Sequence, residues 1–419
     1  MPNPDDSDDP VAEIKSALAI VRPDQIRTLL LRACVCEPIA AATAWQDFQQ
    51  RVGDTKLFFE TDLTGLKGLL PAIYGAARRN KFALEKELQS YLRVATVRED
   101  LRSTVIREIH AGILKTLTEA SIPVITLRGG ALADTAYETP VERHCHALHL
   151  LVRPDALTDV GKALRGCGFE PARLPEAAPG ARQGFRHKDG LPLVVNTSLF
   201  DAPIYRDDAD TLWSASLPAK IAGVPVHVPS PTHHLIYVLT AAFHERTRGH
   251  LRWACDAMLI INGEPGIDWP EFSRMVKSAH LELPIDTMLR FLTEQLDAPV
   301  PRDALTALDV SPSWTNRQIL ETALSGAVGG ISTLREIWRH RMQSKRGHRT
   351  LLRFLFLPST DFLLYRFGPS AKALVPIRYA YRPAAYVGQR LFWRISGLPV
   401  FGRLTHRGKV AAAIAKTRT

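Results

Sequence analysis

Residues 123–154 read PVITLRGGALADTAYETPVERHCHALHLLVRP, and this stretch decides the expected fold. It opens with a short apolar run rich in β-branched side chains, which is typical of a buried strand. Gly129 and Gly130 interrupt that run, residues 131–137 then favour a helix, and residues 148–152 favour a second buried strand. The order of strand, diglycine turn, helix and strand indicates a core that mixes both kinds of secondary structure.

Apolar periodicity outside this core predicts helices, and turn signals predict further strands. Residues 84–120 carry apolar side chains, Val97 and Leu101 among them, at a spacing that predicts a long helix with one buried face. A Lys-Asp-Gly turn predicts a hairpin over 185–195, and residues 224–228 read as a further short strand.

We therefore expect an α+β fold in which a small mixed sheet is flanked by N-terminal and C-terminal helical portions. Ser230 and Asp268 are expected N-caps in the C-terminal portion, which makes His233 and His234 surface or cap-region residues. The predicted segments are an acidic disordered tail at 1–12, helices at 13–120, the α/β core at 121–228, helices at 229–325, and a basic aromatic-rich helical tail at 326–419.

Charge is unevenly distributed along the chain. The net charge is +10, but residues 331–419 alone hold 18 Lys/Arg and 2 Asp/Glu, so the remainder is net acidic. Five cysteines without regular spacing favour a reducing compartment, and the acidic first residues are unlike a signal peptide. No apolar run reaches the roughly 18 residues that span a bilayer. We expect a cytoplasmic protein, at most peripheral to a membrane.

A series of short motifs surrounds and follows the diglycine. They are Leu127 to Leu132, Tyr137, Arg143, Leu150 to Pro154, Gly168, Phe169, His244, Leu251 to Trp253, Asp256, Asp268 and Trp269. In their order and spacing, over roughly residues 25–300, these motifs resemble the uncharacterised bacterial nucleotidyltransferase-like family. That family is the fifth-type NTP-transferase domain of the nucleotidyltransferase superfamily, and the strand, glycine, helix and strand layout resembles the superfamily core.

The resemblance implies transfer of a nucleoside monophosphate from a nucleoside triphosphate to an unknown acceptor, with Mg²⁺ as cofactor. It also implies that Arg128, Gly129, Gly130 and Arg143 contact the nucleotide. Glycines let backbone N–H groups approach a polyanionic phosphate, and the positive end of the following helix adds to the attraction. Arg128 stands where the family usually has lysine, and arginine keeps the charge.

The same resemblance places the three metal-binding acids of the family at Ala147, His149 and Val194. Alanine and valine cannot ligate a metal ion. Neutral imidazole suits zinc, nickel or copper better than Mg²⁺, whose ligands are chiefly carboxylate oxygens. The sequence therefore predicts a degenerate nucleotidyltransferase, that is, a pseudoenzyme that keeps the fold and nucleotide binding without Mg²⁺-dependent catalysis.

Two alternatives stay open at this point. The first is an active transferase in which Glu142, Asp189 or Asp201 supplies the missing acids, although none has the expected spacing. The second is a non-catalytic scaffold that binds a partner.

A transition-metal site is a lesser interpretation of His144, Cys145, His146 and His149, which are close in sequence. Because side chains alternate along a strand, these four would divide between two faces, and the spacings of structural zinc sites are missing. We predict no metal site there and read the cluster as a former active site.

His244, Arg252 and Asp256 form a candidate cleft group. Arg252 and Asp256 are four residues apart and can pair on one helix face as a structural ion pair. Alternatively, His244 and Arg252 face the cleft and contact phosphate or acceptor.

The basic tail mixes cationic and aromatic side chains, and residues 382–395 can form an amphipathic helix. The preferred interpretation of this tail is a cover packed on the core. The second is a segment that binds an anionic membrane surface or a protein partner. The least favoured is a segment that binds nucleic acid.

Overall fold

The structure is a computed structural model, and the part that it describes belongs to one compact unit, residues 22–310. The described residues are 22–62, 66–145, 147–172, 182–200, 209–244, 251–308 and 310. The predicted acidic tail at 1–12 and the predicted basic tail at 326–419 lie outside them. The membrane, protein and nucleic-acid partners proposed for the basic tail therefore stay predictions.

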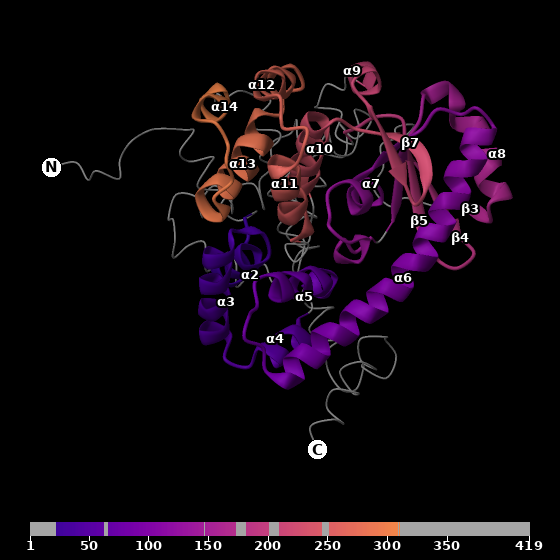
Figure 1. The fold of residues 1–419 in the computed structure, drawn as a ribbon. Coiled ribbons are helices and arrows are strands. Elements are labelled where there is room, and N and C mark those ends of the chain that lie inside the picture. Colours follow the sequence, from indigo (N-terminus) through magenta and orange to yellow (C-terminus); the bar gives the residue numbers. More distant parts are fainter. Residues whose placement is uncertain are drawn as a thin grey trace, which may run out of the picture. The chain divides into compact units, whose positions relative to one another are not determined.

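A group of short helices forms the N-terminal part of this unit (Figure 1). The helices are α2 (Gln25–Val35), α3 (Pro38–Val52), α4 (Thr55–Thr61), the 3-10 helix η2 (Leu66–Leu69) and α5 (Leu70–Arg79). Asp24 and Asp54 begin α2 and α4 because each side chain accepts a hydrogen bond from a backbone N–H three residues on. The buried aromatic side chains of Trp45, Phe48 and Phe59 fill the space between the helices.

Helix α6 (Lys86–Glu119) connects these helices to the sheet, along which its second half packs (Figure 1). The sequence predicted one buried face along its whole length. The second half has such a face, with Ile113, Leu114 and Leu117 buried, but Val97 and Leu101 are 54% and 67% exposed. This part of the prediction is wrong, because the middle of the helix lies between the two parts of the core that bury its ends.

Seven strands form one mixed sheet in the order β3-β4-β5-β2-β1-β7-β6. They are β1 (Ile125–Leu127), β2 (Leu148–Leu151), β3 (Phe169–Ala172), β4 (Arg182–His187), β5 (Pro192–Asn196), β6 (Leu217–Ile221) and β7 (Val224–Val228). The pairs β2–β5 and β1–β7 are parallel and the other four pairs are antiparallel. The predicted hairpin is confirmed as β4 and β5, and the last predicted strand as β7.

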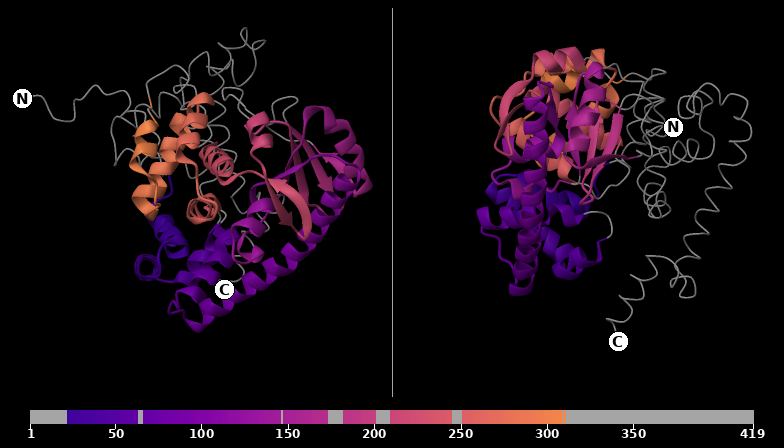
Figure 2. Two further views of the ribbon diagram at one scale, coloured as in Figure 1. Left: turned by 45° about the horizontal axis from the view of Figure 1, so that its top comes forward. Right: turned by 90° about the vertical axis from the view of Figure 1, so that its right-hand side faces the viewer.

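Helices cover both faces of the sheet (Figure 2). One face packs on α6 and on α8 (Leu157–Gly166), which follows the 3-10 helix η4 (Pro154–Ala156). The opposite face packs on α9 (Ala209–Ser214) and on α10 (Pro231–His244). Strand register aligns Leu127 with His149, and His149 with Val194, so these three side chains share the face that α10 covers.

Three C-terminal helices pack around α10: α11 (Arg252–Asn262), α12 (Trp269–Ser278) and α13 (Glu282–Leu296). The last helix, α14 (Arg302–Ala307), packs against α12 and α13. The Asp268 cap is confirmed, since its carboxylate accepts from the backbone N–H of Glu271. His233 and His234 are buried rather than at the surface, because neighbouring helices enclose the start of α10.

The predicted α+β class is confirmed, with a mixed sheet between helical portions at both ends of the described chain. In the residues that the structure describes, no helix combines the length and apolarity needed to cross a bilayer.

Candidate functional site

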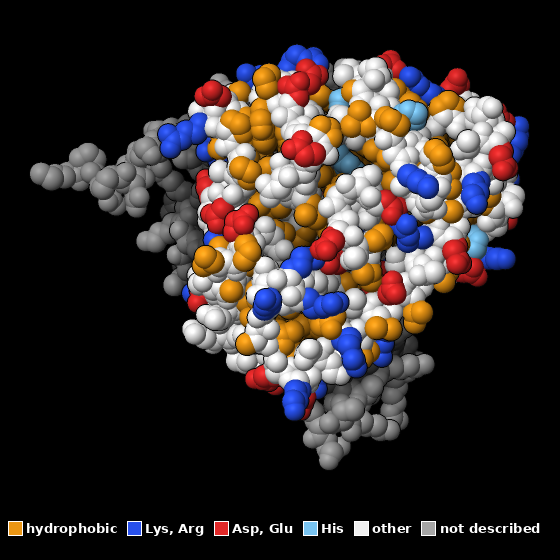
Figure 3. Space-filling view, viewed as in Figure 1, with side chains coloured by type: hydrophobic (Ala, Val, Ile, Leu, Met, Phe, Trp, Pro, Cys, Tyr) orange, Lys and Arg blue, Asp and Glu red, His pale blue; other side chains and the backbone are white. Residues whose placement is uncertain are grey.

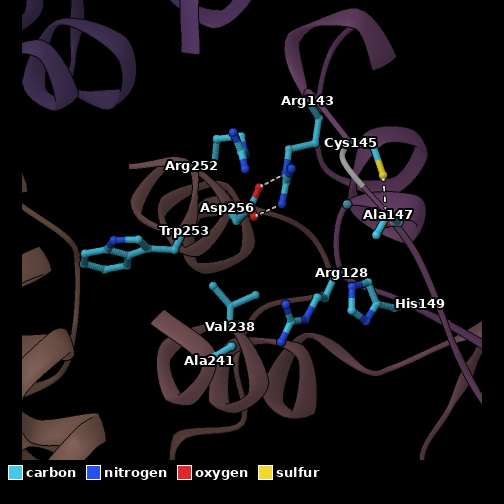
Figure 4. Close-up of a pocket in the computed structure, with 11 residues that line it drawn as sticks. Arg128, Arg143, Cys145, Ala147, His149, Val238, Ala241, Arg252, Trp253 and Asp256 are labelled. Carbon is cyan, nitrogen blue, oxygen red and sulfur yellow. Dashed lines mark hydrogen bonds and ion pairs between the residues drawn. The ribbon is translucent and has the colours of Figure 1, made fainter. Parts of the chain in front are cut away.

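A pocket of about 210 Å³ opens where β1 ends and α7 (Arg128–Thr135) begins. The loop that leads into β2, with its 3-10 helix η3 (Pro140–Glu142), forms a second wall, and α10 and α11 form the third (Figure 4). The lining residues are Arg128, Gly129, Arg143, Cys145, Ala147, His149, Val238, Ala241, Arg252, Trp253 and Asp256. Nine of these eleven residues, all except Val238 and Ala241, were singled out from the sequence, and they meet in one place.

Arg128 joins β1 to α7, and contacts with Tyr237 fix the position of its side chain. Its φ angle is +53°, a left-handed conformation that is rare for a residue with a side chain and is often found at functional sites. Its Nε donates to the hydroxyl of Tyr237 over 2.9 Å, and its guanidinium lies 5.1 Å from the centre of that ring. The arginine is thus fixed against α10 at the edge of the pocket.

Gly129 and Gly130 lie inside the first turn of α7 rather than in a separate loop, which corrects the predicted diglycine turn. A side chain at either position would crowd a neighbour: a Cβ on Gly129 would lie 2.9 Å from Nη1 of Arg143, and one on Gly130 would lie 3.1 Å from Cε1 of His110. Gly129 lines the pocket, whereas Gly130 is turned towards His110 and does not.

Arg143 and Asp256 form a buried ion pair across the pocket wall (Figure 4). Nε and Nη2 of Arg143 each donate to one carboxylate oxygen over 2.7 Å, and the hydroxyl of Tyr137 donates to Oδ1 over the same distance. Burial alone would lower the pKa of Arg143, but Asp256 beside it raises that pKa well above its ordinary value. Arg143 is the ion-pair partner of Asp256, a role that the sequence suggested for Arg252, and its predicted contact with a nucleotide stays a prediction.

Ala147 and His149 both face the pocket, as their spacing of two predicts, while Val194 is buried beside His149 without lining it. The imidazole of His149 is 9% exposed, and its Nδ1 is buried with no hydrogen-bond partner. Burial, with the positive charges of Arg128, Arg182 and Arg143, lowers the pKa of His149 well below its ordinary value, so the ring is neutral at pH 7.

Among the described residues, Asp256 is the single acid that lines the pocket. The alternative donors lie elsewhere: Glu142 pairs with Arg79 over 2.7 Å, Asp189 pairs with His187 at the hairpin, and Asp201 falls outside the described residues. Because Mg²⁺ needs several oxygen ligands and the one carboxylate already binds Arg143 and Tyr137, the described side chains do not fit a magnesium site.

In the cluster at 144–149, His144 and Cys145 contact two different partners. Nδ1 of His144 lies 2.6 Å from a carboxylate oxygen of Glu99, and Sγ of Cys145 donates to the carbonyl oxygen of Ala147. Burial raises the pKa of the Cys145 thiol, which keeps it protonated. His146 is outside the described residues, and within them no three His, Cys, Asp or Glu side chains are placed to hold a metal ion.

Two of the three residues of the predicted cleft group line the pocket. Arg252, the first residue of α11, and Asp256, one turn later, both line the pocket. His244 is the last residue of α10, and its side chain lies outside the description. Sequence reasoning missed Val238 and Ala241 of α10, since a small apolar residue on a buried helix carries no signal of its own.

Two further buried histidines make the fold sensitive to acid. Burial lowers the pKa of His110 and that of His234 to about 4 each, from 6.5. Above pH 6.5 both are neutral in the folded and the unfolded chain, so stability is fully present. As the pH falls towards 4, the unfolded chain gains protons that the folded chain does not, and the free energy of unfolding falls.

We therefore expect His234→Gln to flatten the fall in stability between pH 6.5 and 4, by about 1.4 kcal/mol for each pH unit over which His234 is protonated only when unfolded. Urea unfolding at a series of pH values measures this slope. His227→Gln, at an exposed position on β7, is the control and should leave the slope unchanged. Equal slopes for His234→Gln and the unchanged protein would contradict the assignment.

The mixed sheet with helices on both faces, and the pocket at the junction of β1 and α7, match the layout that the resemblance implied for a nucleotidyltransferase-like core. Comparison with known protein families agrees: the family described as uncharacterised nucleotidyltransferase matches residues 61–297, more than half of the chain. The chain belongs to this family. No curated protein matches it.

Proposed function

We propose that this protein is a degenerate nucleotidyltransferase that binds a nucleotide at the α7 pocket without Mg²⁺ and does not transfer its nucleoside monophosphate. The charge of the pocket carries this proposal. Arg128, Arg143 and Arg252 face one carboxylate, that of Asp256, so the lining has an excess of two positive charges. Such a lining attracts phosphate and repels divalent cations.

The residues at the family's three acid positions account for the loss of nucleotidyl transfer. Ala147 and Val194 have no atom that could bind a metal ion, and His149 lies among positive charges that would oppose one. Without cations beside the triphosphate, the charge that develops on the attacking and leaving oxygens has no metal to stabilise it. An active transferase would need two or more acids at the pocket, and the described residues supply one.

Titration calorimetry with ATP tests the proposal. We expect binding in the presence of EDTA and no ATP turnover with Mg²⁺. Arg252→Ala should weaken binding by about 10- to 100-fold, the value of one charge-assisted hydrogen bond. Arg274→Ala is the matched control, because Arg274 pairs with Glu271 on the exposed side of α12. ATP turnover that depends on Mg²⁺ would refute the proposal.

A further inference from the structure

The positive charges of two arginines and the positive ends of two helices converge at the pocket. Arg128 and Arg252 are the first residues of α7 and α11, so two helices begin at its edge. Neither helix start has a side-chain cap, and the first N–H groups of each helix, together with its dipole, favour an anion. By contrast, Lys/Arg and Asp/Glu side chains are intermixed over the face of the molecule shown in Figure 3.

His149 is an independent sign of a ligand at this pocket. It is more than nine-tenths buried, lines the pocket beside Arg128, and has a ring nitrogen without a partner (Figure 4). A buried polar atom without a hydrogen bond is unfavourable unless something else binds it. A neutral imidazole carries one N–H, which can donate to an oxygen of an anion, as a carboxylate at the same position could not.

We propose that the pocket binds a phosphate group free of metal, with Arg128, His149 and Arg252 as its direct contacts. Here the arginines and the two helix starts offset the negative charge of the phosphate. Divalent cations do this where acids line such a pocket. This inference rests on the proposed function and adds to it the chemical form of the ligand: a phosphate or polyphosphate anion that is not complexed with Mg²⁺.

Two consequences separate this ligand from a magnesium nucleotide. Mg²⁺ competes with the arginines for the same phosphate oxygens, so it weakens binding rather than strengthening it. The pocket of about 210 Å³ is also smaller than the roughly 300–1,000 Å³ of sites that enclose a whole drug-sized ligand. It therefore accommodates the phosphate end of a ligand, and recognition does not require a base or sugar.

The experiment uses the full chain and inorganic pyrophosphate as the probe, with adenosine as a probe that lacks phosphate. In calorimetry with EDTA, pyrophosphate should bind and should compete with ATP, and adenosine should not bind. Excess Mg²⁺ should weaken pyrophosphate binding by tenfold or more. Unchanged or tighter binding with Mg²⁺ would overturn the inference.

Variants at His149 test the contact itself. His149→Asp places a carboxylate beside Arg128, so it should weaken pyrophosphate binding at least 100-fold, whereas His149→Asn keeps a donor and should stay within about fivefold. If His149→Asp does not fold, as judged by its thermal transition, Arg252→Gln decides, with an expected loss of tenfold or more. Arg274→Gln is the control. Affinity that is unchanged in the deciding variant overturns the inference.

Failure of the inference and failure of the proposed function give different results. If ATP binds but pyrophosphate neither binds nor competes, the phosphate site is wrong while nucleotide binding stands. If neither ATP nor pyrophosphate binds, both proposals fail together.

Discussion

Replacing Asp256 by alanine is expected to lower the free energy of unfolding by about 3–5 kcal/mol, the usual cost of removing one partner of a buried ion pair. The side chains of Arg143 and Asp256 are 11% and 4% exposed, so the remaining guanidinium would be left largely out of water. The hydroxyl of Tyr137, which also donates to Asp256, would lose its acceptor. Urea unfolding monitored by circular dichroism measures the loss.

The matched control for this prediction is an exposed pair of the same chemistry. Arg274 donates twice to Glu271, but both side chains reach solvent, so Glu271→Ala should cost less than about 1 kcal/mol. A double replacement, Arg143→Met with Asp256→Leu, removes both charges and should recover part of the loss. If Asp256→Ala costs no more than Glu271→Ala, the pair does not hold the loop before β2 to α11.

The strands that sequence patterns predicted are those at the centre of the sheet. β1, β2 and β5 are buried apolar runs bounded by turns, and their pattern is strong because both faces are covered. β3 and β6 were missed. They are the two edges of the sheet, each contains a proline, and their side chains are largely exposed or half-buried, so little apolar pattern was left to find.

The site was predictable where contacts are local and not where they are distant. A spacing of two placed Ala147 and His149 on one side of β2, and both line the pocket. The partner of Asp256 was predicted from the helix rule as Arg252, four residues away, but it is Arg143, 113 residues away in sequence. Only the packing of α11 against the loop that enters β2 brings these two together, and no local pattern contains that information.

The loss of the acids can be tested by putting them back. A variant with Ala147→Asp, His149→Asp and Val194→Asp is expected to gain a Mg²⁺ site, because the first two positions face the pocket and the third lies beside His149 on the neighbouring strand. Without metal, three adjacent carboxylates repel one another, so its thermal midpoint should lie below that of the parent. Mg²⁺ at 100 times its dissociation constant would restore about 2.7 kcal/mol, and the parent should show no such shift.

The three matching asparagine replacements, at Ala147, His149 and Val194, are the control, since they keep size and polarity but supply no charge. Mg²⁺ should not stabilise that variant, nor a single Ala147→Asp variant, because one carboxylate is too few for a hard divalent cation. Arg128 and Arg143 would compete with Mg²⁺ for the new carboxylates, so the shift should grow when Arg128→Gln is added to the triple variant. A parent protein that Mg²⁺ stabilises as strongly as the triple aspartate variant would mean that its metal-binding acids were never lost.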